Sequence, residues 1–284
     1  MTLRERRRSA AALLAAAGVP SPDHDADALL AHVLGTTRTA LVTAADPTPA
    51  QLETYDALLA RRAAREPLQH LVGVTGFRHV DLVVGPGVFT PRPETELLAG
   101  WAVECAVSTG STTGRAPVLV DLCTGSGAIA KALADEVPRA EVHAVELDPA
   151  AHTWAERNLA GSGVDLRQGD MAESFDDLLG TVDVVTCNPP YVPLTAWESV
   201  APEARDHDPH LALFSGDDGL DAIRVLERRA AALLRPGGWV GFEHADVQGE
   251  SAPGVFSGSG RWAEVRDHRD LADRPRFTTA RLAR

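Results

Sequence analysis

Several features that define other classes of protein are missing from this chain of 284 residues. It has no run near the roughly 18 consecutive apolar residues that a membrane span needs. Its N-terminal stretch, MTLRERRRSAAALLAAAG, has no convincing small-residue cleavage site, and its apolar part fits the first amphipathic helix of a folded domain. We therefore expect a cytoplasmic protein without a membrane anchor.

Cysteine is scarce as well. The three cysteines, Cys105, Cys123 and Cys187, are widely spaced and form no CxxC pair. This spacing suggests neither a disulfide framework nor a zinc site. We expect reduced, mostly buried thiols and no bound metal.

Positive charge is the third shortage. The chain has 27 basic and 40 acidic side chains, a net charge of -13. Eight basic and eight acidic side chains balance in residues 1–75, so residues 76–284 carry the other 19 and 32 and the whole excess. An acidic surface repels duplex nucleic acid and attracts a basic protein partner, although acidity can also serve solubility alone.

What is present fits a globular α/β protein, with 44% apolar residues and a length that suits two domains. Residues 1–66 predict a helical domain of three or four short helices. Apolar residues recur with helical spacing from Ala26 to Leu34, after a Ser21-Pro22 start signal, and Thr48 opens a capping box. Residues 67–91, punctuated by glycine, predict a β-hairpin linker.

Residues 92–284 predict a doubly wound sheet with Rossmann-like order. Pro93 is expected at the first position of a helix, and 110–117 as a surface loop. A helix is expected over 217–234, stopped by Arg235-Pro236-Gly237-Gly238. Strand-like segments at 262–265 and 277–282 predict an antiparallel pair that completes the sheet.

A glycine-rich loop marks the expected cofactor site. Leu122-Cys123-Thr124-Gly125-Ser126-Gly127 follows a buried strand and precedes a helix, where backbone N–H groups can face a ligand. Glu146 ends the next strand about 20 residues later, where a carboxylate can accept hydrogen bonds from both hydroxyls of a ribose. The pattern requires a nucleoside-bearing cofactor, and it also fits the dinucleotide fingerprint G-x-G-x-x-A.

The following strand ends at Gly169-Asp170-Met171, beside the same crevice. Asp170 can accept a hydrogen bond from an exocyclic amine and Met171 can lie against an adenine ring. Asp170 can equally cap the turn that follows it.

The stretch Asn188-Pro189-Pro190-Tyr191 ends another strand and carries the proposed chemistry. Two prolines fix two φ angles and remove two N–H donors, so the turn is stiff and offers acceptors. The Asn188 side-chain oxygen and the Pro189 carbonyl can hold the two hydrogens of a planar NH2 group, with Tyr191 over one face. The bland alternative is an ordinary Asn-Pro turn with Tyr191 as a hydrophobic plug. A further pair at a strand end, Glu243-His244, is interpreted as structural.

The motifs DLCTGSG, VELD, NPPY and PGG together resemble a class I S-adenosylmethionine-dependent methyltransferase. PLQHLVGVTGF, FTPRPETE, GDDGLDAI and FEHADVQGE narrow the resemblance to the peptide chain release factor glutamine N5-methyltransferases (HemK/PrmC type), from about residue 5 to the end. NPPY alone is shared with adenine-N6 and cytosine-N4 nucleic-acid methyltransferases, whereas FTPRPETE with QHLVG is far more specific.

The resemblance implies an N-terminal helical domain, a hairpin linker and a seven-stranded methyltransferase domain that acts on the glutamine of the Gly-Gly-Gln loop in class 1 release factors. The expected cofactor is S-adenosyl-L-methionine, with S-adenosyl-L-homocysteine as product. The residues expected to bind it are Asp121, Cys123, Thr124, Gly125, Ser126, Gly127, Glu146, Asp170, Met171 and Asn188. Cys123 departs from the family, which usually has glycine there, so its side chain narrows the pocket or demands an unusual φ.

The expected catalytic residues are Asn188, Pro189 and Tyr191, and substrate binding adds Pro190 and Arg92. The substrate glutamine amide is a poor nucleophile that must be oriented rather than deprotonated beforehand. We expect a monomer with no direct nucleic-acid or membrane contact. Three alternatives stay open: an adenine-N6 or cytosine-N4 nucleic-acid methyltransferase, a nicotinamide-dependent oxidoreductase, and a silent cofactor-binding scaffold.

Overall fold

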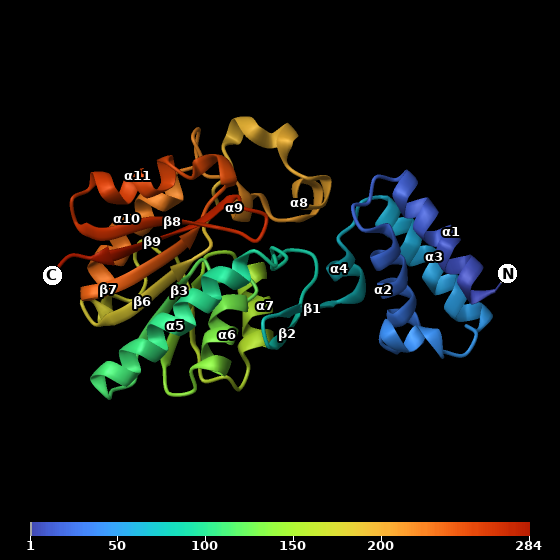
Figure 1. The fold of residues 1–284 in the computed structure, drawn as a ribbon, viewed down its shortest axis with the longest axis horizontal. Helices are drawn as coiled ribbons and strands as arrows, with labels where there is room; N and C mark the ends of the chain where they lie inside the picture. The colour runs from blue at the N-terminus through green and yellow to red at the C-terminus, as the bar shows by residue number, and fades with distance from the viewer. Residues whose placement is uncertain (1) are drawn as a thin grey trace. The chain divides into compact units, whose positions relative to one another are not determined.

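The computed structural model describes residues 2–284 and divides into two compact units. The helical unit comprises the chain up to Val74, Val84–Pro86 and Ala201–His207, and the sheet unit comprises Thr75–Val83, Gly87–Val200 and Asp208–Arg284. Both are drawn in Figure 1. None of the helices in the described residues is long and apolar enough to cross a membrane.

The helical unit is built from α1 (Leu3–Ala16), α2 (Pro22–Leu34), η1 (Thr39–Val42), α3 (Pro49–Ala63) and α4 (Leu68–Val72). Their apolar faces enclose one core, which includes Leu14, Leu30 and Tyr55. The predicted capping box is confirmed: Thr48 accepts from the N–H of Gln51, whose side chain accepts from the N–H of Thr48. As predicted, Ser21 is the N-cap residue of α2 and Pro22 its first residue, although the Ser21 side chain makes no capping hydrogen bond.

The predicted hairpin is present as β1 (Val74–Phe77) and β2 (Val80–Val83), which form a two-stranded sheet. It is shorter than the predicted range 67–91, because 68–72 form helix α4, which ends at the left-handed Gly73. In the sheet unit, the N–H of Val83 donates to the side chain of Asn158 in α7 (Pro149–Leu159) at 2.8 Å, and the Asn158 amide donates back to the Val83 carbonyl.

The main sheet has seven strands in the order β5-β4-β3-β6-β7-β9-β8. The strands are β3 (Val118–Leu122), β4 (Glu141–Glu146), β5 (Asp165–Gln168), β6 (Val182–Cys187), β7 (Leu234–Glu243), β8 (Trp262–Arg269) and β9 (Pro275–Leu282). The five from β3 to β7 are parallel, and β9 pairs antiparallel with both β7 and β8, as predicted. The chain winds outward from β3 in both directions, which confirms the doubly wound prediction.

Helices cover both faces of this sheet. In Figure 1, α5 (Thr95–Thr113), α6 (Ala128–Glu136) and α7 (Pro149–Leu159) lie together on one face, while α10 (Asp221–Leu233) and α11 (Ser251–Gly258) lie on the other. The hydrophobic core between the sheet and helices α10 and α11 includes Val185, Leu226 and Phe256. This packing holds the carboxyl ends of β3, β4 and β6 in fixed positions.

Helix α5 differs from prediction at both ends. It begins at Thr95, because Arg92 to Leu97 form tight i→i+3 turns, so Pro93 precedes the helix rather than starting it. It continues to Thr113, through part of the expected loop 110–117. Thr112 and Thr113 satisfy their hydroxyls on carbonyls four residues back, and Gly114 ends the helix at φ 72°.

Two boundaries near the C-terminal half also differ. Helix α10 begins at Asp221 rather than 217, because Gly216 and Gly219 have positive φ and hold a turn before it. Arg235 to Gly238 were expected only to stop the helix, but they belong to β7, whose pairing with β6 shifts register between Val182 and Val184.

The expected long loop after Tyr191 contains short helices: η3 (Leu194–Ser199), α8 (Pro202–His207) and α9 (His210–Leu213). Two shorter 3-10 turns elsewhere are η2 (Asp176–Leu178) and η4 (Asp246–Gln248). The loop returns to its start, since the N–H of Tyr191 and of Val192 both donate to the carbonyl of Leu213. These two hydrogen bonds join Tyr191 and Val192, at the start of the loop, to Leu213 at its end.

Candidate functional site

The candidate site lies where three parallel strands end side by side. Leu122 at the end of β3 pairs with Cys187 at the end of β6, and Leu122 also pairs with Val145 in β4. Because the chain reverses its winding direction between β3 and β6, these ends form the crevice in which doubly wound proteins bind ligands. The residues that follow them are the predicted loop, Glu146 and the Asn188 turn.

The loop after β3 is shaped by a close approach to α7. Gly127 has φ 83° and forms the N-cap of α6, and a Cβ added there would meet the side chain of Leu159 at 3.0 Å. A residue with a side chain would be strained by its backbone and crowded by Leu159. Glycine thus lets the loop fold tightly against the start of α6, where N–H groups stand free of helical partners.

Asp121 lies beneath this loop and is almost fully buried. Its two oxygens accept from the hydroxyls of Thr124 at 2.6 Å and Thr186 at 2.8 Å, which ties the loop to β6. Burial raises the pKa of Asp121 to about 7, although these hydrogen bonds act in the opposite direction. Asp121 is therefore placed to support the loop from below.

Glu146 faces the loop from the end of β4. One carboxylate oxygen accepts from the N–H of Gly125 at 2.7 Å, and the other accepts from the N–H of Asp148 at 2.8 Å. Burial raises the pKa of Glu146, while these backbone N–H groups lower it in part. Each oxygen uses one of its acceptor positions in this way, and the remaining positions suit the vicinal hydroxyls of a ribose.

Cys123 adopts the backbone conformation that the family's usual glycine would favour. Its φ is 58°, in the left-handed region that costs an L-residue about 1 kcal/mol or more. Its sulfur lies 3.6 Å from that of Met171, so the two expected cofactor-binding residues touch across the site. Cys105 and Cys187 are also free thiols, and only Cys187 is fully buried.

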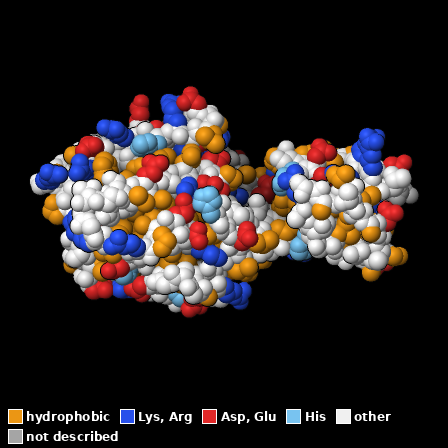
Figure 2. All heavy atoms as spheres, turned by 60° about the horizontal axis from the view of Figure 1, so that its bottom comes forward, with side chains coloured by type: hydrophobic (Ala, Val, Ile, Leu, Met, Phe, Trp, Pro, Cys, Tyr) orange, Lys and Arg blue, Asp and Glu red, His pale blue; other side chains and the backbone are white. Residues whose placement is uncertain are grey.

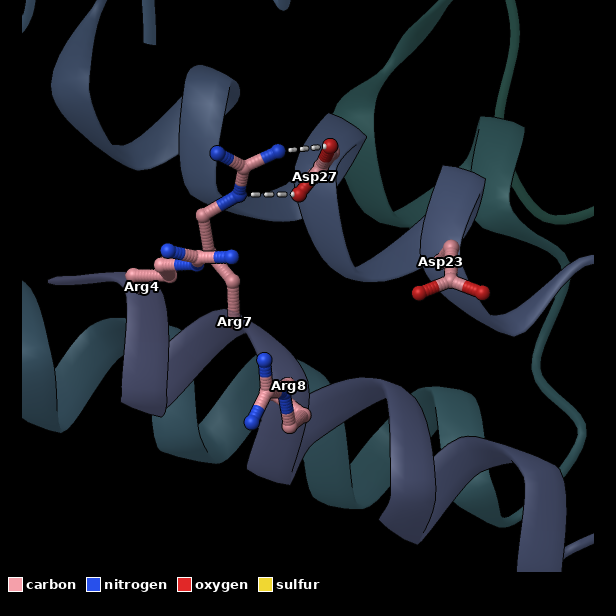
Figure 3. A pocket seen from close by; sticks show the side chains of 5 residues that line it. All are labelled: Arg4, Arg7, Arg8, Asp23 and Asp27. Atoms are coloured by element: carbon pink, nitrogen blue, oxygen red, sulfur yellow. Dashed lines mark hydrogen bonds and ion pairs between the residues drawn. The ribbon is translucent and has the colours of Figure 1, made fainter. Parts of the chain in front are cut away.

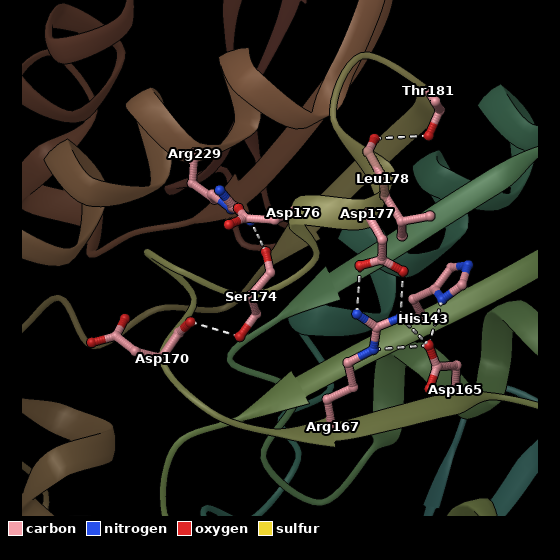
Figure 4. A network of polar contacts seen from close by, with 10 residues as sticks. All are labelled: His143, Asp165, Arg167, Asp170, Ser174, Asp176, Asp177, Leu178, Thr181 and Arg229. Atoms are coloured by element: carbon pink, nitrogen blue, oxygen red, sulfur yellow. Dashed lines mark hydrogen bonds and ion pairs between the residues drawn. The ribbon is translucent and has the colours of Figure 1, made fainter.

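Asp170 caps the turn that follows β5. Its carboxylate accepts from the N–H of Ala172 at 2.8 Å and its carbonyl accepts from the Ser174 hydroxyl at 2.7 Å. In Figure 4 the Asp170 carboxylate points away from the ion pair of Arg167 with Asp177, which lies on the other side of the turn. The side chain is exposed, so an oxygen is accessible to a ligand as well.

The Asn188 turn presents acceptors without partners. Within residues 2–284, the Asn188 side chain and the Pro189 carbonyl make no hydrogen bond. Asn188 is half-buried directly after β6, whose residues are all buried. Pro189 is buried, so both oxygens stand at a strand end without a hydrogen-bond partner in the described residues, and each is an acceptor for an N–H donor.

Tyr191 is oriented by contacts that the sequence did not predict. Its hydroxyl donates to Glu243 at the end of β7, at 3.0 Å, and its carbonyl accepts from the Gln248 amide at 3.0 Å. Burial raises the pKa of Tyr191 well above its usual value, and Glu243 adds to the rise, whereas Arg276 and Arg92 oppose it. The only sequence signal for these partners is the stretch FEHADVQGE, which includes both.

Arg92 lies near this end of the site and is already paired. It donates to the buried carboxylate of Asp208 at 2.8 Å and stacks over the ring of Phe89 at 4.9 Å. Burial raises the pKa of Asp208 to about 6, while Arg92 lowers it in part. Arg92 therefore orders the start of the segment after α8 through Asp208.

A polar pocket of about 250 Å³ lies elsewhere, in the helical unit, between α1 and α2. Figure 3 shows Arg7 paired with Asp27, with Arg4, Arg8 and Asp23 around them. The pocket has no glycine loop or strand end, and its charges are exposed or paired with each other. It does not resemble a nucleoside site.

The doubly wound sheet, the glycine loop under Glu146 and the acceptor turn after β6 together define a class I S-adenosylmethionine-dependent methyltransferase. Two family models agree: residues 5–73 match the PrmC N-terminal domain and residues 119–207 match a methyltransferase domain.

Relatives extend over almost the whole chain. A release factor glutamine methyltransferase of Streptomyces coelicolor is 58% identical over 95% of this chain and 94% of its own length. Another of Mycolicibacterium smegmatis is 46% identical over 99% of both chains. The chain belongs to the release factor glutamine methyltransferase family. A 4-amino-L-phenylalanine/4-methylamino-L-phenylalanine methyltransferase of Streptomyces pristinaespiralis is 44% identical over 78% of this chain and 74% of its own.

Proposed function

We propose that this protein transfers a methyl group to the side-chain nitrogen of the glutamine in the Gly-Gly-Gln loop of class 1 peptide chain release factors. The observation that carries the proposal is the pair of free acceptors on the Asn188 turn, which matches the two hydrogens of a primary amide. Relatives that align over nearly the full length are release factor glutamine methyltransferases, and residues 5–73 match the PrmC N-terminal domain.

In this proposal the turn activates the amide by orienting it. The Asn188 oxygen and the Pro189 carbonyl accept the two amide hydrogens, which fixes the nitrogen and increases its electron density. When bound, S-adenosylmethionine would supply the methyl group: its S–CH3 bond breaks as the N–C bond forms, and S-adenosylhomocysteine leaves as a neutral thioether. The nitrogen gains positive charge as the new N–C bond forms, and its acidified proton then leaves to solvent, so no titratable side chain is required as a base.

The remaining predicted residues have supporting roles in the same proposal. Glu146 accepts from the ribose hydroxyls, and the loop Cys123–Gly127 lies along the cofactor, held from below by Asp121. Asp170 and Met171 take the adenine. Pro190 keeps the turn rigid, Tyr191 covers the amide, and Arg92 borders the substrate entrance.

The strongest alternative substrate class is nucleic acid, since NPPY is shared with adenine and cytosine methyltransferases. The charge distribution favours protein: residues 76–284 hold 19 basic and 32 acidic side chains. On the face drawn in Figure 2, basic and acidic side chains are interspersed rather than gathered in a basic stripe. Nucleic-acid binders neutralise phosphates with clustered Lys and Arg. A cytoplasmic monomer remains part of the proposal.

Methyl transfer to a purified class 1 release factor tests the proposal. With labelled S-adenosylmethionine, the wild-type release factor is expected to gain one methyl group on its Gly-Gly-Gln glutamine, located by mass spectrometry, and a glutamine-to-alanine release factor to gain none. Parallel reactions offer RNA, DNA and 4-amino-L-phenylalanine. Label in one of these, with none in the release factor, would refute the proposal and name the substrate class instead.

A further inference from the structure

Every backbone and side-chain polar atom of Tyr191 has a partner. Its N–H donates to the Leu213 carbonyl, its carbonyl accepts from Gln248 and its hydroxyl donates to Glu243. The backbone of Gly219 also packs closely against that of Tyr191, because a Cβ on Gly219 would lie 2.3 Å from the Tyr191 carbonyl oxygen. Tyr191 is thus more tightly held than Asn188 and Pro189, which precede it in the same stiff turn.

Burying the carboxylate of Glu243 at the end of β7 is energetically unfavourable unless it has hydrogen-bond partners. It is 2% exposed at the end of β7, and one of its oxygens accepts from Tyr191 while the other accepts from the Thr95 hydroxyl at 2.6 Å. Burial raises the pKa of Glu243, and the two hydroxyls together with nearby Arg276 act against that rise. Burying a carboxylate is unfavourable without such partners, and an apolar residue would fill a core position more cheaply.

The direction of the Tyr191 hydroxyl decides what the contact can do. The Tyr191 hydroxyl donates to the buried carboxylate of Glu243, so it is not the group that contacts the substrate amide. The ring between hydroxyl and backbone is only partly buried and packs against the hydrophobic core of the sheet unit. Holding the hydroxyl therefore fixes the plane of the ring and, through the short stiff turn, the two acceptor oxygens.

We propose that Glu243 is a positioning residue for the methyl transfer: it anchors the Tyr191 hydroxyl and so holds the Asn188–Tyr191 turn in the geometry that receives the substrate amide. The inference rests on the proposed function for the reaction itself. Thr95 and Gln248 support the same anchor, from α5 and from the turn after β7. Misplacement of reacting groups by about 1 Å can cost about a hundredfold in rate.

Kinetics of four variants on the release factor test the anchor. Tyr191→Phe and Glu243→Leu are each expected to lower kcat by about ten- to hundredfold, with the Kd for S-adenosylhomocysteine unchanged within about threefold. The double variant is expected to be no worse than the poorer single one, because both remove the same contact. Glu243→Gln keeps an acceptor oxygen for Tyr191, and the Thr95 hydroxyl can accept from its amide, so most of the activity should return.

A matched control is available because the chain has only two tyrosines. Tyr55 in the helical unit is also buried and donates its hydroxyl to the Ala26 carbonyl at 3.0 Å. Tyr55→Phe loses one buried hydrogen bond, as Tyr191→Phe does, and is expected to leave kcat unchanged. Equal losses of kcat in the two variants would show a general effect of lost stability and overturn the positioning role.

A spectroscopic readout does not depend on turnover. Protein labelled with 3-fluorotyrosine gives two fluorine resonances, assigned with the two Tyr→Phe variants. Glu243→Leu is expected to shift the Tyr191 resonance and leave that of Tyr55 in place.

An unshifted Tyr191 resonance, an unchanged kcat in Tyr191→Phe, or additive losses in the double variant would each overturn the inference. Absence of any transfer by the wild-type protein would instead refute the proposed function, while the fluorine spectra still decide whether Glu243 holds Tyr191. Tyr191→Phe is isosteric, so the test survives if Glu243→Leu does not fold.

Discussion

At the scale of single residues, the proposed reaction relies on the Asn188 side-chain oxygen and the Pro189 carbonyl, which accept no hydrogen bond within residues 2–284. Asn188→Ala removes one of the two proposed acceptors and is expected to lower kcat by about a hundredfold, because the amide nitrogen is no longer aimed. The Kd for S-adenosylhomocysteine should change by less than about threefold. Steady-state methyl transfer and calorimetry measure the two quantities.

Asn188→Asp is the matched control, because it keeps a side-chain acceptor at the same position. It should retain more of the wild-type kcat than the alanine variant does. An equal loss of kcat and of cofactor affinity in Asn188→Ala would mean that Asn188 mainly binds cofactor.

Cys123 provides a second prediction at this scale, which concerns stability. At φ 58°, alanine keeps the backbone strain whereas glycine removes it. Cys123→Gly should therefore be more stable than Cys123→Ala by about 1 kcal/mol, the reverse of the usual preference for alanine over glycine. Urea unfolding of both variants measures the difference, and a more stable alanine variant would show that the loop relaxes to a different φ.

At the scale of elements, two helices of the helical unit begin with the same kind of residue but different contacts. Thr48 completes a capping box at α3, whereas Ser21 at α2 makes no capping hydrogen bond. Thr48→Ala should lower the free energy of unfolding by about 1 kcal/mol. Ser21→Ala should change it by only a few tenths of that. Thermal unfolding compares them, and equal losses would contradict the capping explanation.

At the scale of the whole molecule, residues Ala201–His207, which include helix α8, belong to the helical unit although they are distant from it in sequence. Glu203 in α8 pairs with Arg65 at 2.6 Å and with Arg62 at 3.0 Å, and all three belong to the helical unit. Burial opposes ionisation, yet Arg65 and Arg62 hold the pKa of Glu203 at about 2. Because this folded-state pKa is depressed, the stabilisation is complete above the ordinary value of 4.5 and is lost as the pH falls towards 2.

Glu203→Gln removes this charge and is expected to open α8 about tenfold more often at pH 7, as expected for losing about 1.5 kcal/mol of charge-assisted hydrogen bonding. Hydrogen exchange of peptides that cover 201–207 measures the change. Glu198→Gln serves as control, since Glu198 is exposed and its side chain makes no hydrogen bond or ion pair within residues 2–284. Equal exchange in wild type and Glu203→Gln would exclude the ion pairs as the anchor of α8.

Much of the fold is written locally in the chain. The bounds of helix α7 are marked locally, because Asp148 caps its start, Pro149 is its first residue and an amphipathic run follows. The ends of β4 at Glu146 and of β6 before Asn188 agree with prediction, and β3 ends one residue later, at Leu122, because glycine, proline and polar residues interrupt these buried runs. Errors arose where local signals conflict: Pro93 is a helix-start residue, but a tight turn occupies that place.

The sequence by itself determined the patterns proposed to carry the chemistry: a glycine loop, an acid at the next strand end and a stiff acceptor turn, since each is a short contiguous pattern. Only the tertiary structure decided that Glu243 and Gln248 hold Tyr191 and that Asp121 supports the loop through Thr186. The physical reason is the strand order. β7 and β3 flank β6 in the sheet, so residues 52 and 65 positions apart meet at one edge, and no local spacing encodes that meeting.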